Sequence, residues 1–461
     1  MEAPFDIAAD LDTPVSAYIK LQAFKPCFLL ESVEGGERLA RYSFLGLGAA
    51  LTLELRADTL RINGEEAPRP ESGPAWLDTL RETLASSPEL NPSIDGIPFA
   101  GGLVGATGYD VVRYFERLPK NQAELDGLPQ AAYVAPESLL VFDHLTRRVA
   151  LLHSGTEAER QALRKEVIQA LRHGIDARTA RRGFSKAEAS LSRAEFMAVV
   201  ERCKAHITAG DIYQIVLSVR FSGTTDIDPF QCYRALRLLN PSPYMYFLQL
   251  DDLRVAGSSP EALVRLDGRN ASLSPIAGTR PRGRTSEEDL ALEKELLGDP
   301  KENAEHVMLV DLARNDLGRV ATAGSVHVSP YRIIERYSHV MHIVSGVRGE
   351  IVADKDAADL FAATFPAGTL VGAPKVRAME LIAGMEPVAR GLYGGTVGYF
   401  AKNGNMDQAI TIRTLVFNGR EYSFQAGAGI VADSDPEREY EEVLAKSAIL
   451  RRALEIAEEG L

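Results

Sequence analysis

Short strand-like segments outnumber helix-like segments in this chain, and this imbalance constrains the fold more than any other feature. In the first 150 residues, apolar or alternating runs at 27–32, 41–46 and 50–55 are separated by turn residues, and similar runs recur after residue 212. A parallel sheet needs a crossover between consecutive strands, whereas antiparallel strands need only a turn. The pattern therefore predicts an α+β fold with large, mostly antiparallel sheets rather than a doubly wound sheet.

A charged helix and a basic segment rich in Ala and Ser separate two regions of different character. The region before them consists mainly of strands, and from Ser192 a capping box opens a new series of helices and strands. The length of 461 residues is enough for two or three domains. We predict an N-terminal domain over 1–150, a helix and linker over 151–190, and a second domain over 191–461.

Charge and hydropathy exclude several classes of protein. The net charge is −13, which argues against a surface that binds nucleic acid. No apolar run reaches 18 residues, and the first residues are acidic, without the basic and then apolar pattern of a secretory signal. We therefore expect a cytoplasmic protein that binds neither membranes nor nucleic acid. The three cysteines lie far apart in sequence and form no metal-binding spacing.

Residues 272–319 bring positive and negative side chains together. A loop punctuated by Gly and Pro presents two guanidiniums, and a helix then begins at Asp299-Pro300, an N-cap residue followed by proline at the first helical position. Glu302 and Glu305 are three residues apart on one face of that helix. Glu302 also stands where the carboxylate of a capping box would be. This combination suits an anionic substrate held together with a hard cation.

The C-terminal helix repeats this arrangement. It begins at Asp435-Pro436 and carries Glu439 and Glu442 in its first two turns. Two helices that each present a carboxylate pair can hold one Mg²⁺, with one carboxylate of each pair bound directly and the other through water. A solvated acidic helix start would give the same sequence, since helix N-termini also stabilise carboxylates. These residues alone leave both interpretations open.

An arginine and two glycines near the C-terminus suggest a site for an anion. The pattern over 407–416 predicts one strand with Arg413 in its middle, where a guanidinium needs an anion or a buried carboxylate. In the last predicted strand, Gly427 and Gly429 have no side chain, so backbone N–H groups could approach an anion there. The glycine pattern alone is a weak indication.

Two further ionisable residues occupy apolar surroundings. Glu261 follows Ser-Pro at a strand end, and burial there would raise its pKa and allow it to act as an acid. His342 lies inside an apolar run, so the neighbouring residues by default predict a buried core histidine.

Together these motifs resemble the chorismate-utilising enzymes, and within them the large subunits of anthranilate synthases. The resemblance covers nearly the whole chain in order and is strongest over 192–456. The motifs that carry it are LLES (29–32), NPSPYMYF (240–247), SSPE (258–261), PIAGTRPRG (275–283), DPKENAEHVMLVDLARNDLGR (299–319), MHIVS (341–345), FPAGTLVGAPK (365–375), YGGTVGY (393–399), IRT (412–414), QAGAGIVADSDP (425–436) and EYEE (439–442).

This resemblance implies a chorismate-binding domain built as a β-sandwich flanked by helices, and Mg²⁺ as cofactor. It implies direct metal ligation by Glu305 and Glu442, with Glu302 and Glu439 in support. The implied catalytic group contains Glu261 as the general acid, His342, Gln214 and Thr369. The implied substrate contacts are Gly278, Thr279, Tyr393, Arg413, Gly427, Ala428 and Gly429.

Two positions distinguish the possible subfamilies. Isochorismate and salicylate synthases resemble this chain but carry a lysine where it has Gln214, and a neutral amide cannot deprotonate water. Aminodeoxychorismate synthases typically have a nucleophilic lysine where this chain has Ala277. Both differences favour direct addition of ammonia and hence anthranilate synthase, with those relatives as alternatives. Another possible class is a non-catalytic sensor of chorismate or tryptophan. It is disfavoured because the carboxylate pairs would then have no function.

Regulation and partners are expected from the same resemblance. LLES is similar to the tryptophan-binding element of feedback-inhibited members, with a pocket formed by Leu30, Glu31, Ser32, Pro243, Tyr244 and Met245. No cysteine has the strand–turn–helix context of a glutamine-hydrolysing nucleophile, so ammonia is expected from a separate glutamine amidotransferase subunit. The family expectation is a heterotetramer of two large and two small subunits.

Overall fold

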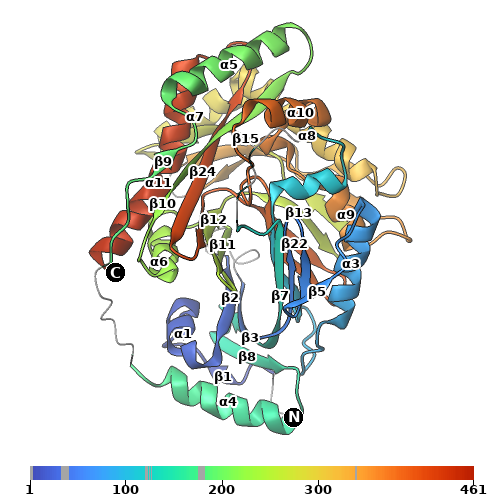
Figure 1. The fold of residues 1–461 in the computed structure, drawn as a ribbon, viewed down its shortest axis with the longest axis vertical. Coiled ribbons are helices and arrows are strands. Elements are labelled where there is room, and N and C mark those ends of the chain that lie inside the picture. The colour runs from blue at the N-terminus through green and yellow to red at the C-terminus, as the bar shows by residue number, and fades with distance from the viewer. Residues whose placement is uncertain are drawn as a thin grey trace.

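The structure is a computed structural model, and it describes residues 4–32, 41–119, 123, 125, 127–174, 182–337 and 340–461. It is a mixture of strands and helices in which the named strand pairs are antiparallel, as predicted (Figure 1). The strands before residue 190 are β1 Ile7–Ala8, β2 Pro26–Glu31, β3 Tyr42–Leu55, β4 Leu60–Ile62, β5 Glu65–Ala67, β6 Gly102–Thr107, β7 Ala131–Asp143, β8 Arg148–His153 and β9 Glu188–Ala189.

Residues after 190 supply the remaining strands and most of the helices. These strands are β10 Gln214–Thr224, β11 Tyr244–Leu250, β12 Leu253–Ser259, β13 Ala262–Asp267, β14 Asn270–Leu273, β15 Ile276–Pro281, β16 His327–Val328, β17 Ile333–Arg336, β18 Val340–Val344, β19 Val347–Glu350, β20 Gly372–Ala373, β21 Thr396–Ala401, β22 Met406–Ile410, β23 Thr414–Asn418 and β24 Glu421–Ile430. The helices are α1 Pro14–Lys20, α3 Gly73–Ser86, α4 Glu157–Leu171, α5 Arg193–Thr208, α6 Pro229–Leu239, α7 Ser286–Gly298, α8 Pro300–Gly318, α9 Ala357–Thr364, α10 Lys375–Met385 and α11 Pro436–Glu459, with short 3₁₀ turns η1 Gln22–Phe24, η2 Tyr109–Tyr114 and η3 Gly368–Leu370.

One large sheet runs through both halves of the chain. Its hydrogen-bonded path can be followed strand by strand as β10-β24-β23-β12-β11-β2-β3-β7-β6-β21-β22-β13-β14-β19. Strands of the first 150 residues therefore pair with later strands at two places, β2 with β11 and β6 with β21.

The sheet curls until its two halves enclose an inner core. Val255 and Val416, from β12 and β23, belong to the same buried cluster as Val397 and Ala409, from β21 and β22 further along the path. Phe99 lies within this cluster and its ring contacts Tyr399. Helices cover the outer faces, where a second and larger core forms. This arrangement confirms the predicted α+β sandwich with flanking helices.

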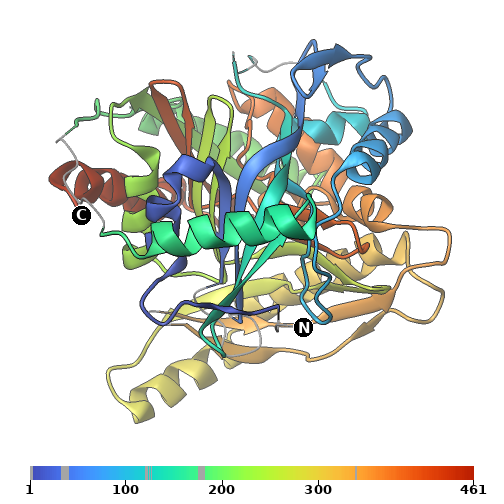
Figure 2. The same ribbon diagram turned by 90° about the horizontal axis from the view of Figure 1, so that it is seen from below.

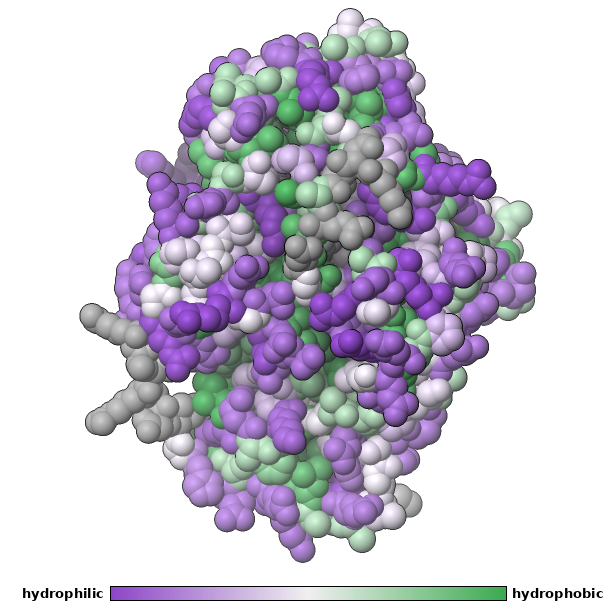
Figure 3. All heavy atoms as spheres, viewed as in Figure 1, coloured by the Kyte–Doolittle hydropathy of each residue, from purple (hydrophilic) through white to green (hydrophobic). Residues whose placement is uncertain are grey.

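The two ends of the molecule carry different helices. Figure 1 shows α5, α7, α8 and α10 gathered at one end of the long strands β10 and β24. In Figure 2, seen from below, α4 crosses the opposite end, where it packs against β8 and α1. Most of the face shown in Figure 3 is hydrophilic. Within the described residues, none of the helices has the length and apolar character needed to cross a membrane.

A small separate sheet lies beside the large one. It has the order β15-β18-β17, and α7 packs on it. Its own apolar cluster consists of Leu296, Met341 and Ile343, apart from the two larger cores. The sheet therefore has a small apolar core of its own.

Two expectations about strands need correction. The segments 41–46 and 50–55 form one long strand, β3, because Gly48, in a left-handed conformation, lets the strand continue through an irregularity in its pairing. Arg413 does not lie in the middle of a strand, since β22 ends at Ile410 and β23 begins at Thr414.

Candidate active site

Helix α8 begins as its sequence predicts. The Asp299 side chain accepts hydrogen bonds from the backbone N–H groups of Lys301 and Glu302, at 2.9 and 3.3 Å, and Pro300 occupies the first turn. Glu302 does not complete a capping box, because the N–H of Asp299 bonds to the carbonyl of Leu296. Its carboxylate instead accepts a hydrogen bond from Arg280 at 3.3 Å.

Helix α11 starts in the same way, and its carboxylates act electrostatically on those of α8. Asp435 caps it by accepting from the N–H of Arg438 at 3.0 Å. Burial raises the pKa of Glu305, and the charges of Glu302 and Glu442 raise it further. Burial and the charge of Glu442 likewise raise the pKa of Glu439. The predicted carboxylate pairs of α8 and α11 therefore meet in one region.

Two of these carboxylates, one on each helix, pair with protein cations. Glu442 pairs with Lys446 at 2.7 Å, and Glu302 pairs with Arg280. Over the described part of the chain, no three His, Cys, Asp or Glu side chains converge closely enough to form a ready ligand group for a metal ion. A cation that needs only one or two direct carboxylate ligands is compatible with this arrangement.

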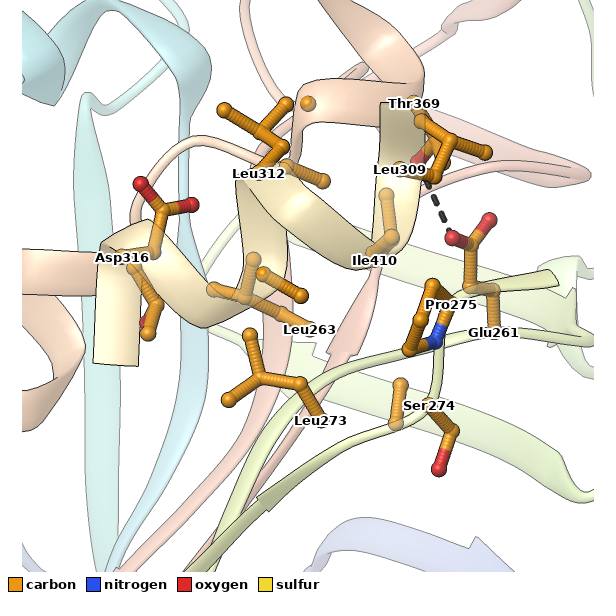
Figure 4. A pocket seen from close by; sticks show the side chains of 15 residues that line it. Glu261, Leu263, Leu273, Ser274, Pro275, Leu309, Leu312, Asp316, Thr369 and Ile410 are labelled. Carbon is orange, nitrogen blue, oxygen red and sulfur yellow. Dashed lines mark hydrogen bonds between the residues drawn. The ribbon is translucent and has the colours of Figure 1, made fainter. Parts of the chain in front are cut away.

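Glu261 lies between β12 and β13, and its carboxylate is buried. The hydroxyl of Thr369, on η3, donates to its Oε1 at 3.0 Å, and Leu309, Leu312 and Asp316 of α8 line the same small pocket (Figure 4). Burial raises the pKa of Glu261 to about 7, and Thr369 and the charges of Lys446 and Arg413 offset only part of this rise. Glu261 is therefore poised to give up a proton near neutral pH.

His342 and Thr279 face each other across the small sheet. Nδ1 of His342 lies 2.8 Å from the carbonyl oxygen of Gly278 and 3.1 Å from the hydroxyl of Thr279. Burial lowers the pKa of His342 despite the bond to Gly278, so the ring is neutral. A neutral ring that donates from Nδ1 to Gly278 keeps Nε2 as an acceptor.

Arg413 is held in the break between β22 and β23. Its φ of 49° is in the left-handed region, which residues other than glycine rarely adopt. Its guanidinium donates to Oδ1 of Asn240 at 3.3 Å, and its charge lowers the pKa of Glu261. The strained turn directs the Arg413 side chain toward Asn240 and Glu261, which a regular strand would not do.

The glycines of β24 leave room for site side chains. A Cβ at Gly427 would lie 2.7 Å from the hydroxyl of Tyr393, and a Cβ at Gly429 would lie 2.7 Å from Nε2 of Gln214. Ala428, between them, pairs with Leu217 of β10. Gln214 donates to Glu305 at 3.4 Å. The predicted substrate contacts on β24 therefore lie beside a predicted metal ligand.

Lys446 is a member of this region that the sequence prediction missed. Its Nζ donates to the carbonyl of Gly427 at 3.1 Å and pairs with Glu442, and its charge lowers the pKa of Glu261. The available signal was its position four residues after Glu442, on the same helix face. By contrast His306, which shares a face with Glu302 and Glu305, is fully buried and bonds to Ser345 at 2.7 Å, as a core residue.

A second cavity lies between the N-terminal strands and β11. All six residues predicted for tryptophan binding line it, and its other lining residues include Arg265, Tyr399 and Asp407. The cavity has an open volume of about 820 Å³. The hydroxyl of Tyr244 donates to Asp407 at 3.0 Å, and burial raises the pKa of Asp407 to about 6.

Glu31 belongs to this cavity, but its carboxylate is already engaged. It accepts hydrogen bonds from Nε and Nη2 of Arg237, at 3.1 and 3.2 Å, and from the hydroxyl of Tyr233, both on α6. Glu31 therefore connects the cavity to α6 and is not a free anion in it.

Comparison with known proteins decides the family. The sequence profile of the chorismate binding enzymes matches residues 25–452. Anthranilate synthase component 1 of Thermus thermophilus is 46% identical over 98% of this chain and 97% of its own length. The Pseudomonas aeruginosa protein of the same name is 44% identical over 99% of this chain and 96% of its own length. This chain belongs to the chorismate-binding enzymes of the anthranilate synthase component 1 family.

Solved structures agree with this assignment. The crystal structure of anthranilate synthase component I from Streptococcus pneumoniae superposes with a TM-score of 0.81 at 34% identity, covering 98% of this chain and all of that one. The isochorismate synthase MenF of Escherichia coli gives a TM-score of 0.72 at 19% identity, covering 96% of this chain and 92% of that one, and shows the shared fold alone.

The raised pKa of Glu261 predicts a pH-dependent effect on stability. The folded protein binds more protons than the unfolded chain between the ordinary value of 4.5 and about 7, so the free energy of unfolding falls as pH rises through this window. At pH 8.5 we expect Glu261→Gln to be more stable than the wild type by up to about 3 kcal/mol, with little difference at pH 4.5. Urea denaturation at both pH values measures this.

The exposed Glu71→Gln substitution is the matched control, since it makes the same chemical change at the surface. An equal stability difference for Glu261→Gln at both pH values would mean that Glu261 is not the buried acid described here.

Proposed function

We propose that this protein is the synthase subunit of an anthranilate synthase and converts chorismate and ammonia to anthranilate, pyruvate and water. The observation that carries this proposal is the setting of Glu261. A buried carboxyl group with a pKa near 7 lies within the electrostatic reach of Arg413 and Lys446, and Lys446 contacts both Gly427 and Glu442. An acid beside groups that suit carboxylates is what the dianion chorismate requires.

The site residues divide this reaction into two halves. In the first half, ammonia adds at C2 while Glu261 gives its proton to the C4 oxygen, the C4–O bond breaks and water leaves. In the second half, the C2 proton is lost, the C3–O bond breaks and the ring becomes aromatic. The side chain leaves as enolpyruvate, whose methylene carbon takes up a proton to give pyruvate. Arg413, Tyr393 and the backbone at 427–429 hold the substrate carboxylates, while Gly278 and Thr279 line the ring.

Neutral His342 has a supporting task in this scheme. Its Nδ1 faces Gly278 and Thr279, which leaves Nε2 to orient the departing hydroxyl as an acceptor. Thr369 holds the carboxyl group of Glu261 in place.

The carboxylates of α8 and α11 suit Mg²⁺ as the cofactor. The charges of Glu302 and Glu442 raise the pKa of Glu305, that of Glu442 raises the pKa of Glu439, and a divalent cation would remove this repulsion. Glu305 and Glu442 would bind it directly and Glu302 and Glu439 through water, after Lys446 and Arg280 give up their carboxylate partners. When bound, Mg²⁺ supplies positive charge for the ring carboxylate of the substrate.

Two positions support ammonia, and not water or an enzyme amine, as the nucleophile. Gln214 is an amide that donates to Glu305 and cannot remove a proton from water. Ala277, on β15, offers no amine to attack the ring. The reaction is therefore proposed as a lyase reaction with free ammonia, and not as isochorismate or aminodeoxychorismate synthesis.

Ammonia is proposed to come from a partner that hydrolyses glutamine. Cys27, Cys203 and Cys232 are all buried, and burial raises the pKa of each thiol, so none of them is an exposed thiolate nucleophile. The name component 1 of the relatives agrees with a second component. We propose a glutamine amidotransferase subunit, a cytoplasmic location and a complex of two large and two small subunits.

Residues 1–150 are proposed to carry feedback regulation by L-tryptophan, 151–190 a helix and linker, and 191–461 catalysis. Leu30, Glu31 and Ser32 line one cavity together with 243–245, although the two segments lie far apart in sequence. The cavity combines apolar walls with the buried acid Asp407 and with Arg265, a setting that suits an amino acid with an aromatic side chain.

The first test is the product formed. Purified protein given chorismate, Mg²⁺ and ammonium should form fluorescent anthranilate, and EDTA should abolish it. Glu305→Gln and Glu442→Gln should lose both the activity and calorimetric Mg²⁺ binding, because each removes a proposed direct ligand. Glu441→Gln is the control, since Glu441 is exposed on the same helix and pairs with Arg193. A different chorismate-derived product would reject the proposed reaction.

The second test concerns the acid. Glu261→Gln keeps the size of the side chain but has no proton to give, so turnover should fall roughly a hundredfold or more. Steady-state kinetics with saturating ammonium measures this. Turnover within about threefold of the wild type would show that Glu261 is not the acid.

The third test concerns feedback. Ser32→Leu places an apolar group at the cavity and should raise the tryptophan concentration needed for half-inhibition at least about tenfold, since it removes room and a polar partner from the ligand. Uninhibited activity should stay unchanged. Ser154→Leu makes the same change at a residue that does not line the cavity. Equal inhibition of both variants would place the inhibitor elsewhere.

A further inference from the structure

Arg390 and Glu386 form a buried ion pair that has no role in the proposed reaction. The side chain of Arg390 is fully buried, and that of its partner Glu386 is 3% exposed. Nε and Nη2 of Arg390 donate to the two carboxylate oxygens of Glu386, at 2.9 and 2.7 Å. Such a pair contributes little to stability on balance, because the cost of removing two charges from water is comparable to their attraction. Its presence calls for a reason other than stability.

The remaining donors of Arg390 reach two segments that carry site residues. Nη1 donates to the carbonyl of Leu370 at 2.6 Å, and Leu370 follows Thr369, the residue that holds Glu261. Nη2 donates to the carbonyl of Val216 at 2.8 Å, and Val216 pairs with Gly429 across the sheet. One guanidinium thus connects the backbone behind the acid with the strands that carry Gln214 and Gly429.

Aromatic contacts extend this connection to a third segment. The guanidinium carbon of Arg390 lies 5.7 Å from the ring centre of Tyr393 and 4.7 Å from that of Tyr109. The hydroxyl of Tyr393 in turn lies against Gly427. Arginine can make these contacts together because its planar group offers five donors at its edge and a flat face for stacking.

Glu386 fixes the same network from the other side. Its Oε1 accepts from the N–H and the hydroxyl of Ser218, at 2.9 and 2.7 Å, and Gln425 of β24 donates to that hydroxyl at 2.8 Å. Burial opposes the charge of Arg390, but Glu386 more than compensates, and the pKa of Arg390 lies above its ordinary value. Through Ser218 and Gln425 the pair is bound to both β10 and β24.

We propose that Arg390, oriented by Glu386, is a positioning residue that sets the acid Glu261 and the carboxylate-binding group of Tyr393 and residues 427–429 at their working separation. This inference rests on the proposed function, in which Glu261 donates a proton and Tyr393 binds a substrate carboxylate. The pair touches none of the reacting atoms and acts through Thr369, β10 and Tyr393.

The deciding variant is Arg390→Lys, which keeps the positive charge but loses the fork that bonds Glu386, Leu370 and Val216 together. We expect kcat to fall between about tenfold and a hundredfold, because a small misplacement of catalytic groups lowers the rate by about this factor. The KM for chorismate should change less than kcat. The alkaline limb of the pH profile of kcat/KM should also move upward, because the bond from Thr369 that lowers the pKa of Glu261 is weakened.

Arg160→Lys is the matched control. Arg160 is also buried, bonds both carboxylate oxygens of Glu157 at 2.7 Å and reaches the carbonyl of Leu151 at 3.3 Å, but it lies on α4 at the far end of the molecule. It should lose stability without a change in kcat or in the pH profile. If Arg390→Lys behaves in the same way, with a lower Tm only, the positioning role is wrong.

A second variant keeps the test decisive if Arg390→Lys does not fold. Glu386→Gln combined with Arg390→Met removes both charges and keeps an oxygen acceptor for Ser218. We expect a folded protein with kcat at least about tenfold lower, and wild-type kcat would overturn the proposal. The wild-type assay separates the two possible failures, because absence of anthranilate rejects the proposed function alone. In that case the variants are compared with the wild type by the rate of the product that the wild type does form, or by its affinity for chorismate.

Discussion

The pairing of β10 with β24 is the interaction on which the candidate site depends. The two strands stay in register from Ile215 opposite Ile430 to Thr224 opposite Glu421. At the upper end of this ladder Gln214 lies beside Gly429, and the chain leaves β24 directly into α11 with Glu439 and Glu442. A shift of one residue would turn every side chain of a strand to the opposite face. The register therefore decides which groups face the candidate site and how far they lie from the carboxylates of α11.

The other half of the site comes from α8 and the small sheet. Glu302 and Glu305 stand at the start of α8, and Gly278, Thr279 and His342 belong to the small sheet with its own apolar cluster. Glu302 pairs with Arg280, and on α11 Glu442 pairs with Lys446. A metal ion bound by both helices would replace these protein cations and would relieve the repulsion that raises the pKa of Glu305.

Local sequence rules predicted part of this site well. The Asp-Pro starts of α8 and α11, and the excess of strands over crossover helices, follow from capping and turn chemistry that acts within a few residues. They correctly indicated where the two helices begin and the α+β fold. The assignment of roles to single residues came from the family resemblance, and those roles stay predictions.

Other features depend on contacts between distant segments, which local patterns do not contain. Residues 407–416 have the composition of one strand, but the chain breaks at Arg413 and adopts a left-handed turn. Glu386 is only four positions from Arg390, but the other hydrogen-bond partners of Arg390, Leu370 and Val216, lie 20 and 174 positions away, and this part of the network is invisible in sequence. The hydrogen bond from Arg237 of α6 to Glu31 is likewise a contact between distant segments.

The two cavities are mechanically connected through β22. Asp407, near one end of this strand, lines the cavity proposed for tryptophan and accepts a hydrogen bond from Tyr244. At the other end, the N–H of Ile410 donates to the backbone carbonyl of Glu261 at 3.0 Å, and the strand breaks off toward Arg413. Antiparallel partners β13 and β21 hold β22 on both sides. One paired strand thus connects the backbone beside Tyr244 and Asp407 to the backbone of Glu261 and to the turn at Arg413.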